Sequence, residues 1–280
     1  MGEITTEELR RRYEAGERDF RGLDLSEIQL FGTFADSNFT NVDFRCVEIS
    51  ICSFIGCDLS GVDFRGAHIV NALIIEGCVF TNLNLSNIFG NALICKEGDF
   101  RGVQLSRISL SYGSATGCDL RGIDLSESLW WNADFSSSSF EGAKLAWSDL
   151  RGSNFEGVDF TRADLRGVDF TRAKLMDSDC TAANLRAAIL TRANLTRACL
   201  NDANLCGAWL EDAILCEAIL SYTKGTNAIL KGANFKGAET SCAPHLYKKY
   251  FLRGAILWNT ILPDGELFIG PEPTYIGNRF

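Results

Sequence analysis

The sequence has little of the material from which enzyme active sites and metal centres are built. Histidine occurs twice, at His68 and His245, and no two cysteines form a C-x-x-C pair. A structural zinc site needs four closely spaced thiolates or imidazoles, so no metal site is expected. The chain also lacks a phosphate-binding glycine loop, a dinucleotide-binding glycine motif and an H-E-x-x-H stretch. We therefore expect no catalytic residues and no cofactor, and interpret the protein as a non-enzyme.

Positive charge and long apolar runs are scarce as well. The 27 Lys and Arg residues are outnumbered by 36 Asp and Glu residues, which gives a net charge of −9. Nucleic-acid binding relies on basic surfaces, so no direct binding of DNA or RNA is expected. No apolar run approaches the ~18 residues of a membrane span. The first residues, MGEITTEELRRR, lack the apolar stretch of a signal peptide. These features favour a cytoplasmic protein that does not bind membranes.

What the sequence has instead is a period of five residues. In the stretch 149–170, DLRGSNFEGVDFTRADLRGVDF, a Leu or Phe returns at every fifth position, and a small residue usually stands two places before it. A helix shows a period of 3.6 and a strand a period of two, so neither explains the pattern. A short period sustained along a chain indicates a solenoid, whose units bury their apolar residues by stacking on one another. Two residues of each five then point inward, and three face solvent.

These repeats resemble the pentapeptide-repeat family, whose motif is A(D/N)LXX and whose members are abundant in cyanobacteria. The closest matches to the motif are ADLRG (163–167), ANLRA (183–187), ANLTR (193–197), ANLCG (203–207) and ANFKG (233–237). The resemblance covers nearly everything from Asp19 to Leu262. It implies an all-β fold, a right-handed quadrilateral parallel β-helix in which four repeats make one coil.

The register of the repeats predicts about twelve coils. The series of inward residues lacks one residue before Phe34, has one extra residue before Phe80, and is interrupted at 241–250. Thr5 and Glu8 have the spacing of a capping box, which predicts a short helix that covers the first coil. We therefore expect a capping helix within 1–18, the β-helix over 19–262 with a loop insertion at 241–250, and a tail over 263–280.

The eleven cysteines are explained by the same register. Several fall on inward positions, where cysteine acts as a small buried hydrophobe, and this use is typical of a reducing compartment. The cysteines predicted to point inward are Cys52, Cys57, Cys78, Cys95, Cys118 and Cys180. Those predicted to point outward are Cys199, Cys206 and Cys216.

An acidic ladder is the first candidate site. It consists of Asp99, Asp119, Asp159 and Asp179, which the register places in one column on one side of the solenoid. A solvated polar face is the simpler interpretation, because Arg101 and Arg121 stand beside the first two carboxylates. The alternative is mimicry of the charge of DNA. The resemblance allows this alternative, since the quinolone-resistance members of the family look like DNA and bind DNA gyrase.

An apolar stripe is the second candidate site. On one side of the last coils, the outward position that normally holds Asp or Asn holds apolar residues instead, and Trp258 stands beside the last of them. The stripe, as the term is used below, consists of Ile189, Trp209, Ile229, Ile256 and Trp258. Contiguous exposed apolar surface usually marks a contact. Its cover is either the chain's own tail or the 241–250 loop, or else a protein partner or a second copy of the chain.

These observations favour a solenoid that acts as a protein–protein interaction surface or scaffold, with a protein partner that the sequence does not identify and with a homodimer as one option. The alternative function is a DNA-mimicking regulator of a DNA-binding enzyme such as DNA gyrase.

Overall fold

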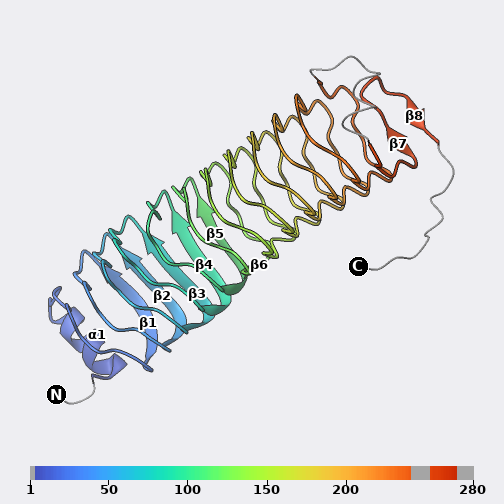
Figure 1. Cartoon of the computed structure of the whole chain (residues 1–280). Coiled ribbons are helices and arrows are strands. Elements are labelled where there is room, and N and C mark those ends of the chain that lie inside the picture. Colours follow the sequence, from blue (N-terminus) through green and yellow to red (C-terminus); the bar gives the residue numbers. More distant parts are fainter. Residues whose placement is uncertain (1–3, 241–252, 270–280) are drawn as a thin grey trace.

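The computed structural model describes residues 4–240 and 253–269, and these ranges form one long solenoid with the N-terminus at one end and the last strands at the other (Figure 1). One helix, α1 (Thr6–Glu14), closes the N-terminal end. Most of the regular strands lie in the first half of the chain, and two short ones lie at the far end. The strands are β1 (Gln29–Ala35), β2 (Glu48–Ile55), β3 (His68–Glu76), β4 (Phe89–Lys96), β5 (Ser109–Thr116), β6 (Leu129–Trp130), β7 (Thr260–Ile261) and β8 (Leu267–Phe268).

Helix α1 lies within the range 1–18 that the sequence predicts for a capping helix. The Thr5 hydroxyl accepts a hydrogen bond from the Glu8 backbone N–H at 3.3 Å, which is the N-cap half of the predicted capping box. Leu9 is fully buried on the core side, and the Tyr13 hydroxyl accepts a hydrogen bond from the Ala35 N–H at 3.0 Å. After the helix, Gly16 adopts φ +98°. The helix therefore covers the first coil.

The repeats wind into a parallel ladder. Strands β1 to β6 form a six-stranded parallel sheet in sequence order, and single parallel β-bridges extend the pairing over four columns of positions. From Trp131 to Thr240 each side of a coil keeps one paired residue instead of a strand. Regular strands therefore account for about five turns, where the sequence predicted twelve coils. The predicted right-handed winding stays a prediction. One column, called the Gln29 column below, runs through Gln29, Glu48, His68, Phe89, Ser109, Leu129, Asp149, Asp169, Ile189, Trp209, Ile229 and Ile256.

Each repeat is a short extended piece followed by a tight turn. In the repeat centred on Phe160, the Ala163 N–H donates to the Phe160 carbonyl at 2.9 Å, and Arg162 between them adopts φ +59°. The Phe160 N–H donates to the Asp179 carbonyl of the next coil at 2.7 Å. Some backbone N–H and C=O groups are therefore hydrogen-bonded within the turn, and others are hydrogen-bonded to the next coil. Few backbone groups need other partners.

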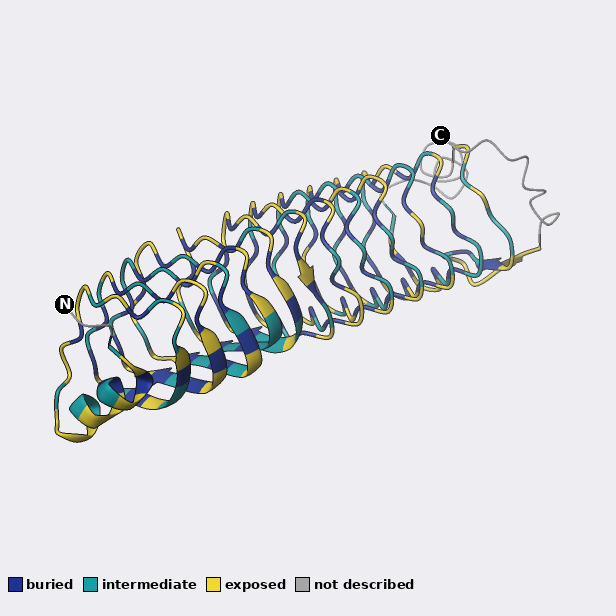
Figure 2. Cartoon of the chain, turned by 90° about the horizontal axis from the view of Figure 1, so that it is seen from below, coloured by how far each residue is buried: buried dark blue, intermediate teal, exposed yellow. Residues whose placement is uncertain are grey.

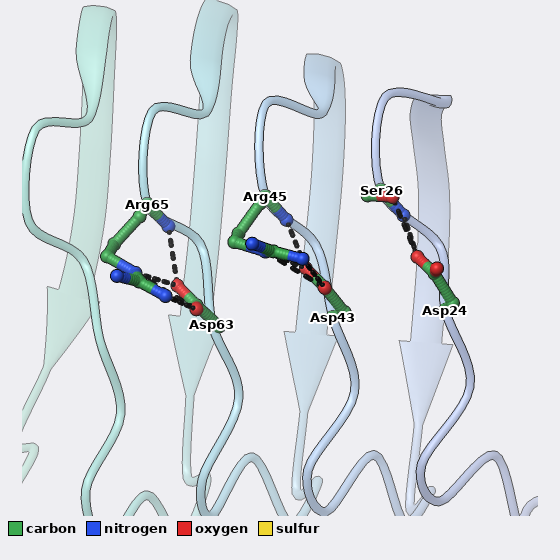
Figure 3. A network of polar contacts seen from close by, with 6 residues as sticks. All are labelled: Asp24, Ser26, Asp43, Arg45, Asp63 and Arg65. Carbon is green, nitrogen blue, oxygen red and sulfur yellow. Dashed lines mark hydrogen bonds and ion pairs between the residues drawn. The ribbon is translucent and has the colours of Figure 1, made fainter.

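The Asp or Asn before each inward residue has a structural task. Its carboxylate or amide oxygen accepts a hydrogen bond from the backbone N–H two residues on, as Asp43 does from Arg45 at 2.9 Å. Figure 3 shows this bond on three successive rungs, where Arg45 and Arg65 also pair with the carboxylates through their side chains and Ser26 bonds to Asp24 through its hydroxyl. The polar face of a typical rung thus stabilises its own turn.

The interior is a continuous apolar core, dark blue along the inside of the coils in Figure 2. Phenylalanines stack on neighbouring rungs, for example Phe44 on Phe64 with ring centroids 4.9 Å apart and Phe135 on Phe155 at the same distance. Several polar inward residues bond to the backbone, as the Thr223 hydroxyl does to the Leu200 carbonyl at 2.7 Å, whereas the buried Ser128 hydroxyl has no partner. The predicted assignment of inward and outward positions therefore holds through the regular part of the solenoid.

The position of the extra residue was predicted wrongly. The sequence placed it just before Phe80, with Ile74 as an inward residue. In the structure the register of β3 shifts between Ile69 and Ala72 against both neighbouring strands. A one-residue shift reverses which residues face the core. Leu73 and Ile75 are therefore buried, and Ile74 lies outward and half-buried.

The corner between two sides of the coil is straightened in the same region. Strands β2 to β5 run through it as single strands of eight or nine residues, although the repeat elsewhere turns there. The turn needs a residue at positive φ two places after the inward residue, and in β2 that place is taken by the β-branched Ile51, which disfavours the conformation. The result is one broad sheet on this side of the N-terminal half, drawn as wide arrows in Figure 1.

Candidate protein-contact surfaces

The acidic ladder lies in one column, as predicted, but it is interrupted. Parallel bridges join Asp99 to Asp119 and Asp159 to Asp179, and Ser139 occupies the rung between the two pairs. The carboxylates therefore form two short runs instead of one continuous ladder.

Arginine side chains pair with the first run. The Arg101 guanidinium donates to Asp99 at 2.6 Å and lies 3.3 Å from the Asp119 carboxylate, which also pairs with Arg121 at 2.6 Å. The hydrogen bond from Arg101 is the main cause that lowers the pKa of Asp99 to about 2. The negative charge of this run is thus largely balanced by its own neighbours.

The carboxylates of the second run, Asp159 and Asp179, stabilise the turns that follow them. Asp159 accepts from the Thr161 N–H at 2.8 Å, and Asp179 accepts from the Thr181 N–H at 2.9 Å. These are the turn bonds found throughout the solenoid. The acidic ladder therefore has the geometry of a solvated structural face, and its role as a DNA mimic stays a prediction.

The stripe is brought together by the fold. Ile189, Trp209, Ile229 and Ile256 are consecutive rungs of the Gln29 column, joined by parallel bridges. This confirms the predicted alignment, and it also places the 241–250 insertion between two paired rungs. Trp209 and Ile256 are exposed, whereas Ile189 and Ile229 are half-buried.

The margin of the stripe carries charges of both signs. The Lys231 ammonium lies 4.8 Å from the centroid of the Trp258 ring, which is a cation–π contact. Near Trp209, the Arg192 guanidinium lies 3.5 Å from the Asp212 carboxylate. An apolar centre with a mixed polar margin is the usual anatomy of a protein-binding surface.

The described part of the tail pairs with the column next to the stripe. Strand β8 pairs antiparallel with β7, and Ile261 of β7 belongs to the neighbouring column through its bridge to Asn234. Leu267, Phe268 and Ile269 are themselves exposed. Residues 241–250 and the end of the tail lie outside the described residues, so cover by them stays a prediction.

A second apolar surface was found only in part by sequence reasoning. The outward side of the broad sheet exposes apolar side chains on four successive strands, with 56% of Ile51 and 55% of Tyr112 accessible to solvent. We call this surface the sheet face; its large apolar members are Ile51, Ile55, Val70, Phe89, Ile94 and Tyr112. The repeat pattern predicts a smaller patch of Leu73, Phe89 and Ile94 near the extra residue before Phe80. Phe89 and Ile94 do lie on the sheet face, whereas Leu73 is buried. One sequence feature could have predicted the whole sheet face: Lys, Arg, Asp and Glu are absent from 49–55, 69–75, 89–95 and 109–116.

The described ranges 4–240 and 253–269 hold neither a metal-ligand cluster nor a membrane-spanning helix. They contain no group of three His, Cys, Asp or Glu residues placed to hold a metal ion. His68 stacks on Phe89 at a centroid distance of 4.7 Å, which is a packing contact on the sheet face. None of the helices described there is long and apolar enough to cross a membrane.

The repeats of this solenoid match a known family model. The family model for pentapeptide repeats matches eight copies, which cover residues 24–88 and 118–237. The chain belongs to the pentapeptide-repeat family. No curated protein matches it.

Several solved structures are similar to this pentapeptide-repeat chain. HetL, described as involved in heterocyst differentiation regulation in the cyanobacterium Nostoc, is 26% identical over 95% of this chain and 100% of its own, with a TM-score of 0.25. QnrB1, a plasmid-mediated fluoroquinolone resistance protein, is 17% identical over 86% and 92%, with a TM-score of 0.37. Rfr23 from the cyanobacterium Cyanothece is 23% identical over 51% and 90%, with a TM-score of 0.24. These similarities assign no function to the chain.

Proposed function

We propose that this chain is a non-enzymatic scaffold that binds a protein partner through the stripe. The observation that carries the proposal is the alignment of four apolar residues on consecutive rungs at a position where the repeat normally carries Asp or Asn.

The fold itself does not require apolar residues at these positions. Asp and Asn on other rungs stabilise their turn by accepting a backbone hydrogen bond, as Asp159 does from Thr161. An Ile or Trp side chain has no oxygen that could accept this bond. The stripe therefore gives up a turn bond on each rung and exposes apolar area, which is unfavourable by roughly 25 cal/mol per Å². Cover by a partner would offset both costs.

The composition of the stripe suits a protein partner. Trp209 is about half exposed, at 48%, and Trp and Arg are the residues most enriched at the energetic centres of protein interfaces. The four rungs span roughly 14 Å at a spacing of ~4.8 Å per rung, which is a suitable length for one helix or strand of a partner.

The DNA-mimic alternative has weaker support. A mimic of the DNA backbone needs a regular series of unbalanced negative charges, whereas Ser139 interrupts this column and Arg101 and Arg121 pair with its first two carboxylates. Strong inhibition of DNA gyrase supercoiling by the purified protein, abolished by Asp159→Asn with Asp179→Asn, would favour this alternative.

The test of the stripe restores the residue that the repeat normally has. Trp209→Asp is expected to leave the melting temperature unchanged or slightly raised, because the new carboxylate can accept the turn bond. Partners captured by the wild-type protein from its native cells should be lost with Trp209→Asp. The matched control is Tyr222→Asp, at a corner residue that is 70% exposed, and this variant should capture the same partners. Equal capture by all three proteins would refute the proposal.

A further inference from the structure

The sheet face is unusual because it carries no charge at its centre. Charged residues make up 22% of the chain, yet none occurs in the central stretches of β2 to β5. Charges lie only at the ends of these strands, at Glu48, Glu76 and Lys96. Figure 2 shows exposed positions alternating with buried ones along these strands.

The backbone of this sheet is already satisfied. Each of β2 to β5 is paired on both sides by parallel neighbours, and α1 packs at the β1 end, where the Arg10 guanidinium lies 5.0 Å from the centroid of the Phe31 ring. A partner therefore cannot add a strand here and must pack on side chains. Sheets that pack face to face do so at a separation of about 10 Å with their strands nearly aligned.

We propose that two copies of this chain pack together through their sheet faces. An interface with two-fold symmetry uses the same patch on both copies, so the patch must be complementary to itself. A patch with no central charge meets this requirement, since no like charges come into contact. The chain has a net charge of −9, so two copies approaching through a charged side would repel each other.

The area of the sheet face suits such a dimer. The sheet face comprises the strands β2 to β5, of eight or nine residues each. At ~4.8 Å per strand and ~3.3 Å per residue, these strands make a face of roughly 19 by 26 Å. Two such faces bury on the order of 1,000 Å², the size of a weak, reversible interface. A reversible dimer that forms at micromolar concentrations is the expected result. This contact is independent of the stripe, because Asp149 and Asp169 occupy the rungs between the two surfaces.

The experiment is sedimentation velocity of the full chain from about 1 to 200 μM, a range chosen to bracket micromolar affinity. The wild-type protein should shift from monomer to dimer across this range. Ile51→Glu with Tyr112→Glu should raise the dissociation constant at least tenfold, because each dimer would then bury four unpaired carboxylates. Both positions are outward and more than half exposed, so a circular dichroism melt should match that of the wild type.

Two controls locate the contact. Tyr222→Glu changes a residue that is more exposed, at 70%, and lies away from the sheet face, and Trp209→Asp alters the stripe. Both variants should dimerise like the wild type. A photo-crosslinking amino acid at Val70 should give dimer adducts that map to residues 48–116 of the second copy. A wild-type protein that stays monomeric up to 200 μM would overturn the proposal, and so would a dimer lost with Trp209→Asp but kept in the double variant.

Discussion

Ile189 and Trp209 pair in a parallel β-bridge, although twenty residues separate them in the sequence. One turn of the solenoid has this length in the regular part of the chain, so residues twenty apart become neighbours along the axis. The residues that form one surface feature of this protein are therefore spaced twenty apart in the sequence. They become neighbours only when the coils stack. The same relationship makes the stability of each rung depend on the rungs before and after it.

The first prediction tests inward against outward positions. Leu165→Asp should abolish cooperative folding or cost about 4 kcal/mol or more, because the carboxylate would be buried in a core position that is fully inaccessible in the structure. Ala182→Asp introduces the same residue at an exposed turn position with φ +57°, a conformation that Asp tolerates, and should change stability by less than about 0.5 kcal/mol. Thermal melts followed by circular dichroism would decide. Equal melting of the two variants would contradict the assignment of positions.

The second prediction concerns a close approach between coils. Gly90 adopts φ +122°, and a Cβ atom built on it would lie 2.1 Å from the Ile69 carbonyl oxygen. Gly90→Ala should therefore destabilise the protein by about 2 kcal/mol or more, since backbone on the adjacent rung has to move. In the control, Gly22→Asn, the new side chain has free space at φ +66°, and the effect should stay within about 1 kcal/mol. Urea unfolding would measure the free energy of unfolding of both variants, provided that its dependence on urea concentration is the same as in the wild type. An unchanged free energy of unfolding in Gly90→Ala would contradict the prediction and would show that the spacing of the rungs adapts.

The third prediction is the order of thiol labelling. Cys46 is exposed at a turn and should react first, while the half-buried Cys199, Cys206 and Cys216 follow. Cys95 and Cys180 should react only on unfolding, because burial shields their sulfurs and raises the pKa of both thiols, that of Cys180 to about 12. Timed alkylation with peptide mapping gives the order. Early labelling of Cys180 in the folded protein would contradict its inward position.

The fourth prediction is the acid response of Asp99. Its folded pKa is lowered from 3.8 to about 2, mainly by the hydrogen bond from Arg101. A lowered folded pKa means that the pair stabilises the folded state above the ordinary pKa of 3.8, and this contribution is lost as the pH falls towards 2. Arg101→Gln should move the pKa of Asp99 up towards 3.8 in an NMR titration of the carboxyl carbon. Arg166→Gln, which removes the partner of Asp164 instead, should leave it unchanged. An unchanged pKa in Arg101→Gln would show that another group holds the carboxylate.

The sequence by itself determined the family, the parallel solenoid and the direction in which most side chains point. This was possible because each five-residue repeat specifies its own turn and its own inward residues. Leu165 is inward and Ala182 is outward for reasons that lie within a few residues of each. The alignment of Ile189 with Trp209 also follows from counting, as long as the register does not slip.

Only the tertiary structure decided the features that depend on the stacking of coils. The extra residue in β3 is taken up between Ile69 and Ala72 because that register lets Leu73 and Ile75 enter the core between two neighbouring strands. The straightened corner of β2 to β5, and with it the sheet face, depends in the same way on strands twenty residues apart. Arg101 forms ion pairs with two carboxylates, Asp99 and Asp119, because Asp119 lies on the adjacent rung. The five-residue period determines the conformation of each repeat. The packing of successive coils determines where the register shifts and where a corner is straightened.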